Sequence, residues 1–199
     1  MQILVVLFIG IIATIIGALP FGLVNLTVLN TSFHNGHNSA MKIAHGAAWI
    51  EVLFGLLAIL VGNSLIQVTS ENQILQYIIP LFPALIGFVF LFKKASKNKE
   101  IKTKYSGFLK GAFLNLISLQ VLLYWLIAIT FLNSRNIQFQ NKTEVIIFLI
   151  GIWCSKMIVL WFYSFLSKRI YSKWQFLGSN INRVIGGILL FTAFIQFFK

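Results

Sequence analysis

Two residues of opposite charge interrupt long apolar stretches of this 199-residue chain. Glu51 lies about nine residues into one stretch, and Lys156 lies about twelve residues into another. A charge at the centre of a bilayer costs at least about 2.5–3.5 kcal/mol on insertion scales, so it normally faces a bundle interior or a watery cavity. The two side chains therefore predict either a buried ion pair or a site that handles a proton, an ammonium or a carboxylate.

A helix breaker with small neighbours lies near the N-terminus. Pro20 follows Gly17 and precedes Gly22, and Asn25 comes within the next turn. Proline removes the hydrogen bond to the carbonyl four residues back, and glycine permits unwinding or close approach. Backbone groups freed at membrane depth must face protein or a cavity, and paired breaks of this kind point to a transporter's midplane site. Simple adaptation of helix packing is the alternative interpretation.

The second half of the chain repeats this pattern faintly. A Gly-Ala pair is again followed by neutral polar side chains, here Gly111, Ala112, Asn115, Ser118 and Gln120. The apolar stretches with Glu51 and Lys156 are the second and fifth of six, so each half carries one mid-helix charge. Three helices per half reverse the direction of the second half, which is how an inverted-repeat transporter is built.

The elements that would position these residues are six apolar blocks. They span about 2–29, 43–66, 74–92, 107–132, 145–166 and 176–198. The chain is 58% hydrophobic and 10% charged, whereas a soluble domain has about 25% charged residues. A helix of roughly 20 residues matches a hydrocarbon core of about 30 Å. The sequence predicts an all-α integral membrane protein with six transmembrane helices in a 3+3 inverted repeat.

The polar joints between the blocks set the expected domain and orientation. The chain reads as a single transmembrane domain over 1–199, with half-repeats at about 1–92 and 107–199 joined by a basic loop at 93–106. The first, third and fifth joints hold ten Lys and Arg, against two in the others. By the positive-inside rule the odd joints are cytoplasmic and both termini lie outside. The net charge of +12 therefore suits anionic lipid headgroups, and no nucleic-acid partner is predicted.

The sequence offers few residues for catalysis or metal binding. The chain has no Asp and no pair of carboxylates or histidines at membrane depth, so we do not expect an enzyme. The lone Cys154 is interpreted as a small hydrophobe. Three histidines, His34, His37 and His45, lie near the first joint, and neutral imidazole binds transition metals. Divalent metal export is thus an alternative function. The simpler interpretation is that these histidines lie in a solvated loop and bind no metal.

The segment from Pro20 to Leu53, PFGLVNLTVLNTSFHNGHNSAMKIAHGAAWIEVL, resembles the first helical hairpin of the LysE/RhtB family of amino-acid exporters. The matching features are a break, a turn glycine, a helix glycine and an acid, here Pro20, Gly22, Gly36, Gly46 and Glu51. The segment GFLKGAFLNLISLQVLLYW resembles the second signature region of the family. There the chain has Ser118-Leu119-Gln120 where the family usually has Asn-Pro-Lys.

This resemblance implies a secondary active exporter of amino acids or related small solutes across the cell membrane, coupled to protons or ions. It implies no cofactor, a small-molecule solute, a lipid bilayer around the protein and room for a homo-oligomer. The binding site is expected between the broken parts of helices one and four, from Pro20, Gly22, Asn25, Glu51, Asn115, Ser118, Gln120 and Lys156. Metal export and a non-transporting membrane scaffold remain as alternatives.

Overall fold

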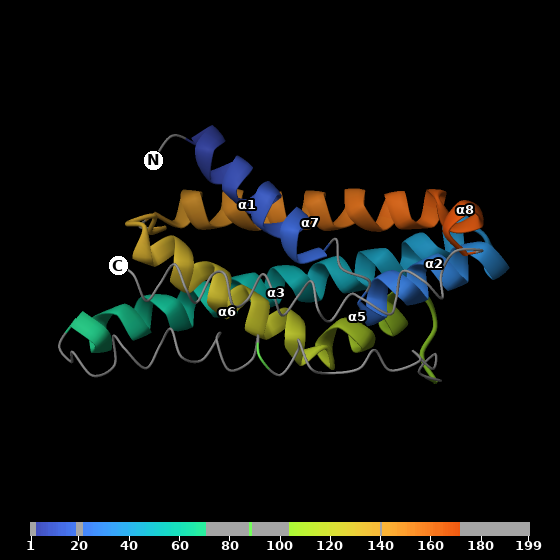
Figure 1. Cartoon of the computed structure of the whole chain (residues 1–199), viewed down its shortest axis with the longest axis horizontal. Coiled ribbons are helices and arrows are strands. Elements are labelled where there is room, and N and C mark those ends of the chain that lie inside the picture. Colours follow the sequence, from blue (N-terminus) through green and yellow to red (C-terminus); the bar gives the residue numbers. More distant parts are fainter. Residues whose placement is uncertain (1–2, 19–21, 71–87, 89–103, 140, 172–199) are drawn as a thin grey trace.

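The chain is helical in the part that the computed structural model describes, which comprises residues 3–18, 22–70, 88, 104–139 and 141–171. Two long helices, α3 (His37–Ser70) and α7 (Lys142–Phe165), run side by side along the molecule, and shorter helices lie against them (Figure 1). The all-α class predicted from the apolar blocks is confirmed for these residues.

The first apolar block forms two helices. α1 spans Ile3–Ala18 and α2 spans Leu23–Asn35, with a bend of 76° between them. Asn25, in the first turn of α2, donates from Nδ2 to the carbonyl of Ala18 over 2.5 Å. This bond satisfies one of the carbonyls that a helix leaves free at its end. The chain is thus broken where the sequence predicts, although Pro20 itself lies outside the described residues.

The polar joint expected over 30–42 is much shorter than predicted. α2 continues through its polar end to Asn35, and α3 begins at His37. Gly36 alone connects them, with a φ of 85° that favours glycine and a backbone N–H bonded to the carbonyl of Ser32 at 3.1 Å. Hydropathy indicates where the chain leaves the apolar layer. The helix itself continues until a residue such as Gly36 adopts a non-helical backbone conformation.

The fourth apolar block is also broken, without a proline. α5 spans Gly107–Leu116 and α6 spans Leu119–Ser134, with a bend of 62° between them. The hydroxyl of Ser118 donates to the carbonyl of Leu114 at 2.7 Å, and the Ser118 N–H bonds the carbonyl of Asn115 three residues back. Such side-chain bonds and tightened turns compete with regular helix geometry.

Glycines allow two pairs of helices to pack backbone against backbone. A Cβ on Gly46 of α3 would lie 1.9 Å from the carbonyl oxygen of Phe108 in α5, and one on Gly111 would lie 1.8 Å from that of Ile43. At the crossing of α1 and α7, Cβ atoms on Gly10 and Gly151 would lie 2.7 and 2.9 Å from carbonyl oxygens of the facing helix. Small residues at such crossings are typical of membrane helix pairs.

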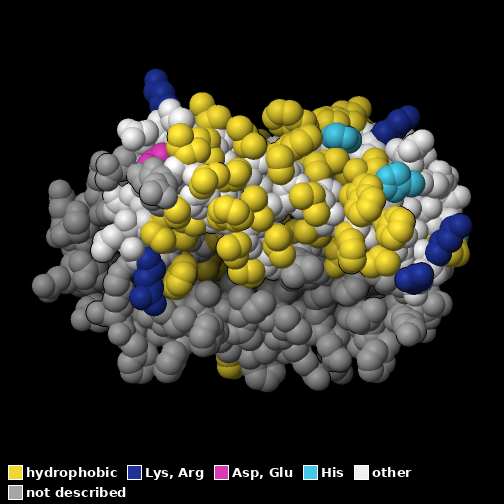
Figure 2. Space-filling model, turned by 90° about the horizontal axis from the view of Figure 1, so that it is seen from above, with side chains coloured by type: hydrophobic (Ala, Val, Ile, Leu, Met, Phe, Trp, Pro, Cys, Tyr) yellow, Lys and Arg dark blue, Asp and Glu magenta, His cyan; other side chains and the backbone are white. Residues whose placement is uncertain are grey.

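The described helices supply up to four candidate membrane spans. His37–Gly62 of α3 and Lys142–Phe165 of α7 are long and apolar enough singly, and the bent pairs α1/α2 and α5/α6 qualify jointly. In the view of Figure 2, the described part of the surface carries mostly hydrophobic side chains, with Lys and Arg toward its two ends. This is the surface of a multi-pass membrane protein. The predicted third and sixth helices, 74–92 and 176–198, lie outside the described residues apart from residue 88.

Candidate functional site

The two mid-helix charges form an ion pair inside the bundle. Lys156 Nζ of α7 lies 3.0 Å from Glu51 Oε2 of α3, and the two side chains are only 5% and 2% exposed. Removing two charges from water is costly, and close pairing offsets part of that cost. The pair that the sequence allowed is therefore present at the contact between the two long helices.

Two further helices supply donors to the same carboxylate. Asn115 Nδ2 of α5 donates to Glu51 Oε2 at 3.2 Å, and Trp125 Nε1 of α6 donates to Oε1 at 3.3 Å. Asn115 and Trp125 are both fully buried. Helices α3, α5, α6 and α7 thus meet around one carboxylate, which is held by a cation and two N–H donors.

The side-chain amide of Asn115 has one acceptor atom that makes no hydrogen bond. Its Nδ2 donates to the carbonyl of Ala47 at 2.7 Å as well as to Glu51, so both amide hydrogens are used. Exchanging the amide nitrogen and oxygen would place two acceptors together, so these bonds fix the amide orientation. The remaining atom, Oδ1, is buried and has no partner. A buried acceptor without a partner costs about 1–3 kcal/mol, which favours a bound donor there.

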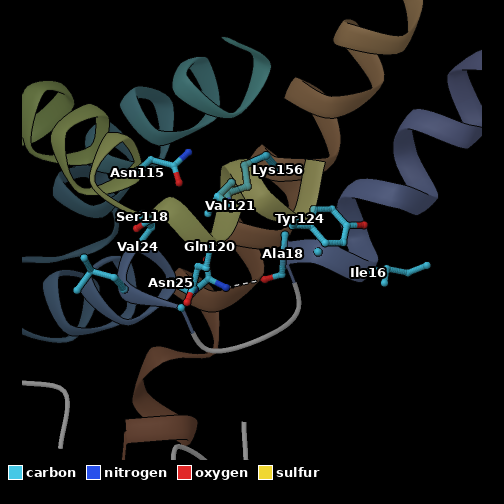
Figure 3. A pocket seen from close by; sticks show the side chains of 13 residues that line it. Ile16, Ala18, Val24, Asn25, Asn115, Ser118, Gln120, Val121, Tyr124 and Lys156 are labelled. Carbon is cyan, nitrogen blue, oxygen red and sulfur yellow. Dashed lines mark hydrogen bonds between the residues drawn. The ribbon is translucent and has the colours of Figure 1, made fainter. Parts of the chain in front are cut away.

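A cavity of about 70 Å³ lies next to this cluster. It is lined by ends of the two broken helices and by one residue of α7, namely Ile16, Gly17, Ala18, Gly22, Leu23, Val24, Asn25, Asn115, Ser118, Gln120, Val121, Tyr124 and Lys156. Figure 3 shows these side chains and the bond from Asn25 to Ala18 at one edge. A single water molecule needs roughly 10–15 Å³ of such space, so the cavity is large enough to be hydrated.

The helix ends add fixed partial charges to the cavity wall. Gly22 precedes α2 in an extended conformation and provides no side-chain cap. Ser118 precedes α6, and its side chain does not cap that helix either. Free backbone N–H groups at a helix start favour anions, while the carbonyls that end α1 favour cations. A Cβ on Gly22 would lie 3.3 Å from Gln120 Nε2, so the two breaks approach each other closely. The cavity wall therefore carries partial charges of both signs.

Comparison with known proteins places the chain in a family. The sequence model of the LysE type translocator family matches residues 15–197. The chain belongs to the LysE translocator family. It is accordingly a membrane translocator of small solutes, and the resemblance found in its sequence is confirmed. No curated protein and no solved structure gives a match to the chain.

The cavity of this translocator collects most of the residues expected at the site. Six of the eight line it, namely Gly22, Asn25, Asn115, Ser118, Gln120 and Lys156. Glu51 lies behind Asn115 and Lys156, which separate it from the cavity. Pro20 lies outside the described residues, so its placement stays a prediction.

Two aromatic neighbours of the translocator site were not among the predicted residues. Trp125 bonds Glu51, and Tyr124 lines the cavity. A Trp or Tyr within an apolar block is usually a packing residue, so its type and position alone give little signal. The spacing offers a partial clue, because Trp125 falls in the same apolar block as Asn115 and Ser118.

The histidines of the translocator do not gather into a metal site. His37 Nδ1 lies 2.8 Å from the hydroxyl of Ser164, and the ring of His45 lies 5.9 Å from that of Trp153. Within the helices described above, no group of three His, Cys, Asp or Glu side chains could hold a metal ion. The metal-export alternative therefore gains no support from these residues.

Proposed function

We propose that this translocator exports small amino acids or related zwitterionic solutes across the cell membrane, coupled to a proton or another cation. The observation that carries this proposal is the buried, unpartnered Oδ1 of Asn115 on a small cavity that Lys156 also lines. An acceptor and a cation on one wall suit a solute that carries both an ammonium and a carboxylate.

Lys156 and Asn115 divide the recognition of the solute between them. An ammonium has three N–H donors, and the pair with Glu51 engages one, so Lys156 retains donors for a solute carboxylate. Asn115 Oδ1 accepts from the solute ammonium. Both residues bond Glu51 Oε2, at 3.0 and 3.2 Å, so they lie close enough to hold the two ends of one amino-acid head group.

Binding of the solute and binding of the coupling cation are linked through Lys156. A solute carboxylate that draws Lys156 toward the cavity weakens its bond to Glu51. A buried carboxylate without a counter-charge is strongly unfavourable, so Glu51 then takes up a proton or a cation. Solute binding at Lys156 and ion binding at Glu51 are thereby linked, as coupled transport requires.

An inverted repeat of three helices per half agrees with the spacing of the described glycines and charges. Glu51 follows Gly46 by five residues in α3, and Lys156 follows Gly151 by five residues in α7. These are the two glycines at which α3 and α7 meet their backbone partners, α5 and α1. The equal spacing from glycine to charge at the two crossings, and the ion pair that joins α3 to α7, support the proposed six-span 3+3 arrangement.

The proposed orientation of the translocator follows from the distribution of basic residues. The end of the bundle with Gly36 and the start of α5 carries the basic joints, so we place it in the cytoplasm, with both termini outside. Alternating access between the two halves would then expose the cavity to each side in turn.

Efflux of labelled amino acids from loaded vesicles tests the proposal, with Glu51→Gln and Asn115→Leu as variants. We expect Glu51→Gln to lose the dependence of efflux on a pH or ion gradient, because the coupling carboxylate is gone. We expect Asn115→Leu to raise the solute KM by at least about ten-fold, because a hydrogen bond to a charged group is lost. Glu144→Gln at the start of α7 is the matched control. Unchanged coupling in Glu51→Gln removes Glu51 from the mechanism.

A further inference from the structure

Tyr124 of α6 joins the two broken helices across the cavity wall. Its hydroxyl donates to the carbonyl of Ala13 in α1. Its ring lies directly on Gly17, where a Cβ would be 2.3, 2.6 and 2.8 Å from three ring atoms. Tyr124 and Gly17 both line the cavity. The ring therefore occupies space that only a glycine leaves free, and it fills the gap between α1 and α6 in the cavity wall.

The directions of α1 and α6 indicate on which side of the cavity this contact lies. From their bends, α1 and α6 both extend toward the end of the bundle at which α1 begins (Figure 1). Tyr124 lies near the start of α6, where the two helices are still close (Figure 3). Removal of its ring from Gly17 would open the cavity toward the N-terminal side of the molecule.

The next residue along α6 connects this contact to the ion pair. Trp125 donates from Nε1 to Glu51 Oε1 at 3.3 Å, and its ring meets that of Tyr124 edge to face, with centroids 5.5 Å apart. Trp125 is fully buried, so it cannot turn without moving its neighbours. One turn of α6 thus carries both the residue that closes the cavity and the residue that contacts the coupling carboxylate.

We propose that Tyr124 is the gate on the N-terminal side of the cavity and that Trp125 couples its movement to Glu51. The inference rests on the proposed function, since a gate matters only where a solute passes. When Glu51 exchanges Lys156 for a proton or cation, its bond to Trp125 is rearranged. The second turn of α6 then shifts, Tyr124 leaves Gly17, and the cavity opens toward the N-terminal side.

Thiol labelling in sealed vesicles of both orientations tests the gate. Cys154 is the only cysteine, so Cys154→Ala gives a cysteine-free background, and Val121→Cys places a reporter in the cavity. We expect Tyr124→Phe to raise the rate of labelling by a membrane-impermeant reagent about five-fold from the N-terminal side alone, because one interhelical hydrogen bond is lost. Tyr105→Phe, which alters an exposed tyrosine before α5, is the matched control.

A second pair of variants guards against a loss of folding. Gly17→Ala adds a methyl group that displaces the ring while leaving Tyr124 intact, and it should raise labelling from the same side. Trp125→Phe should abolish the effect of a pH or ion gradient on the labelling rate. Equal increases from both sides, or no change in either gate variant, would overturn the proposal. Labelling needs no transported solute, so a directional change with no amino-acid efflux would reject the substrate class and retain the gate.

Discussion

At the scale of single residues, the buried ion pair is a feature that stability alone does not explain. Two charges that are nearly inaccessible to water must be desolvated, and well-packed apolar residues of similar volume are often equally stable or more so. The donors from Asn115 and Trp125 reduce that cost but do not remove it. The position of the pair beside a cavity therefore agrees with the proposed role in binding and coupling.

A cycle of single and double substitutions separates stability from function at this pair. Lys156→Met leaves Glu51 unpaired in the bundle and should lower stability by about 3–5 kcal/mol. Glu51→Leu combined with Lys156→Met removes both charges and should recover most of that loss. The effect is measured as the shift in melting temperature of the detergent-solubilised protein, with the folded fraction at each temperature determined by size-exclusion chromatography. Efflux should stay absent in the stable double variant, and normal efflux there would show that the pair is only structural.

Two buried asparagines provide a matched test of the cavity acceptor. Both polar atoms of Asn133 near the end of α6 lack partners, whereas Asn115 uses its nitrogen and leaves only Oδ1 free. Asn133→Leu should leave stability unchanged or raise it, because an unsatisfied amide is replaced by an apolar group. Asn115→Leu should lower stability by about 1–3 kcal/mol, because the acceptors at Ala47 and Glu51 lose a donor. Equal melting shifts for the two variants would contradict this assignment.

The sequence predicts the charged and amide residues of the site better than the aromatic ones. Glu51 and Lys156 stand out because charge is rare and costly in an apolar block, and their pairing is confirmed. Tyr124 and Trp125 do not stand out, because their polar tips are one atom on a large apolar body. Their roles depend on a carbonyl in α1 and a carboxylate in α3, and those partners are distant in the sequence.

At the scale of helices, the two breaks arise by different routes. The first lies at Pro20, where the sequence predicts a break. Asn25 bridges it by bonding the carbonyl of Ala18, a contact that the sequence does not predict. The second has no proline and depends on Ser118 bonding the carbonyl of Leu114. Serine does this in many intact helices, so the sequence pattern alone cannot fix the second break. The broken ends nevertheless meet at one cavity, as the interpretation of an inverted repeat requires.

The glycine crossings predict an order of stability for alanine substitutions. Gly46→Ala and Gly111→Ala place a methyl group within 1.9 Å of a backbone oxygen and should prevent close packing of α3 on α5. Gly10→Ala, whose Cβ would lie 2.7 Å from a carbonyl oxygen, should be milder. Gly36→Ala meets nothing within 4 Å and should cost only about 1 kcal/mol through its positive φ. Melting temperatures in detergent provide the comparison, and a reversed order would refute the assigned crossings.

At the scale of the whole molecule, the described contacts constrain how the chain threads the membrane. The start of α3 packs on α5, since Gly111 meets Ile43, while the far part of α3 packs on the end of α6, near Gly62 and Asn133. α3 therefore ends at one side of the bundle and α5 begins at the other. Together with the basic loop at 93–106, this arrangement supports a third span within 74–92, which stays a prediction.

Cysteine topology mapping decides between the predicted threading and its alternatives. In the cysteine-free background, Gly36→Cys and Ser106→Cys should react from the cytoplasmic side, and Asn141→Cys should react from outside. Positions 36 and 106 share a side only if the chain crosses the membrane twice between them, as α3 and a third helix would. Positions 106 and 141 differ because the bent pair α5/α6 crosses once.

Each outcome of that mapping has one structural meaning. Labelling of positions 36 and 106 from opposite sides would remove the third span and, with it, the 3+3 inverted repeat. The predicted pattern with its sides exchanged would retain the repeat and reverse the orientation derived from ten basic residues against two. Replacement of the six Lys between 93 and 104 by Gln should produce a mixture of both orientations, because the largest cytoplasmic charge cluster is then lost. A uniform orientation in that variant would show that helix packing, rather than charge, sets the threading.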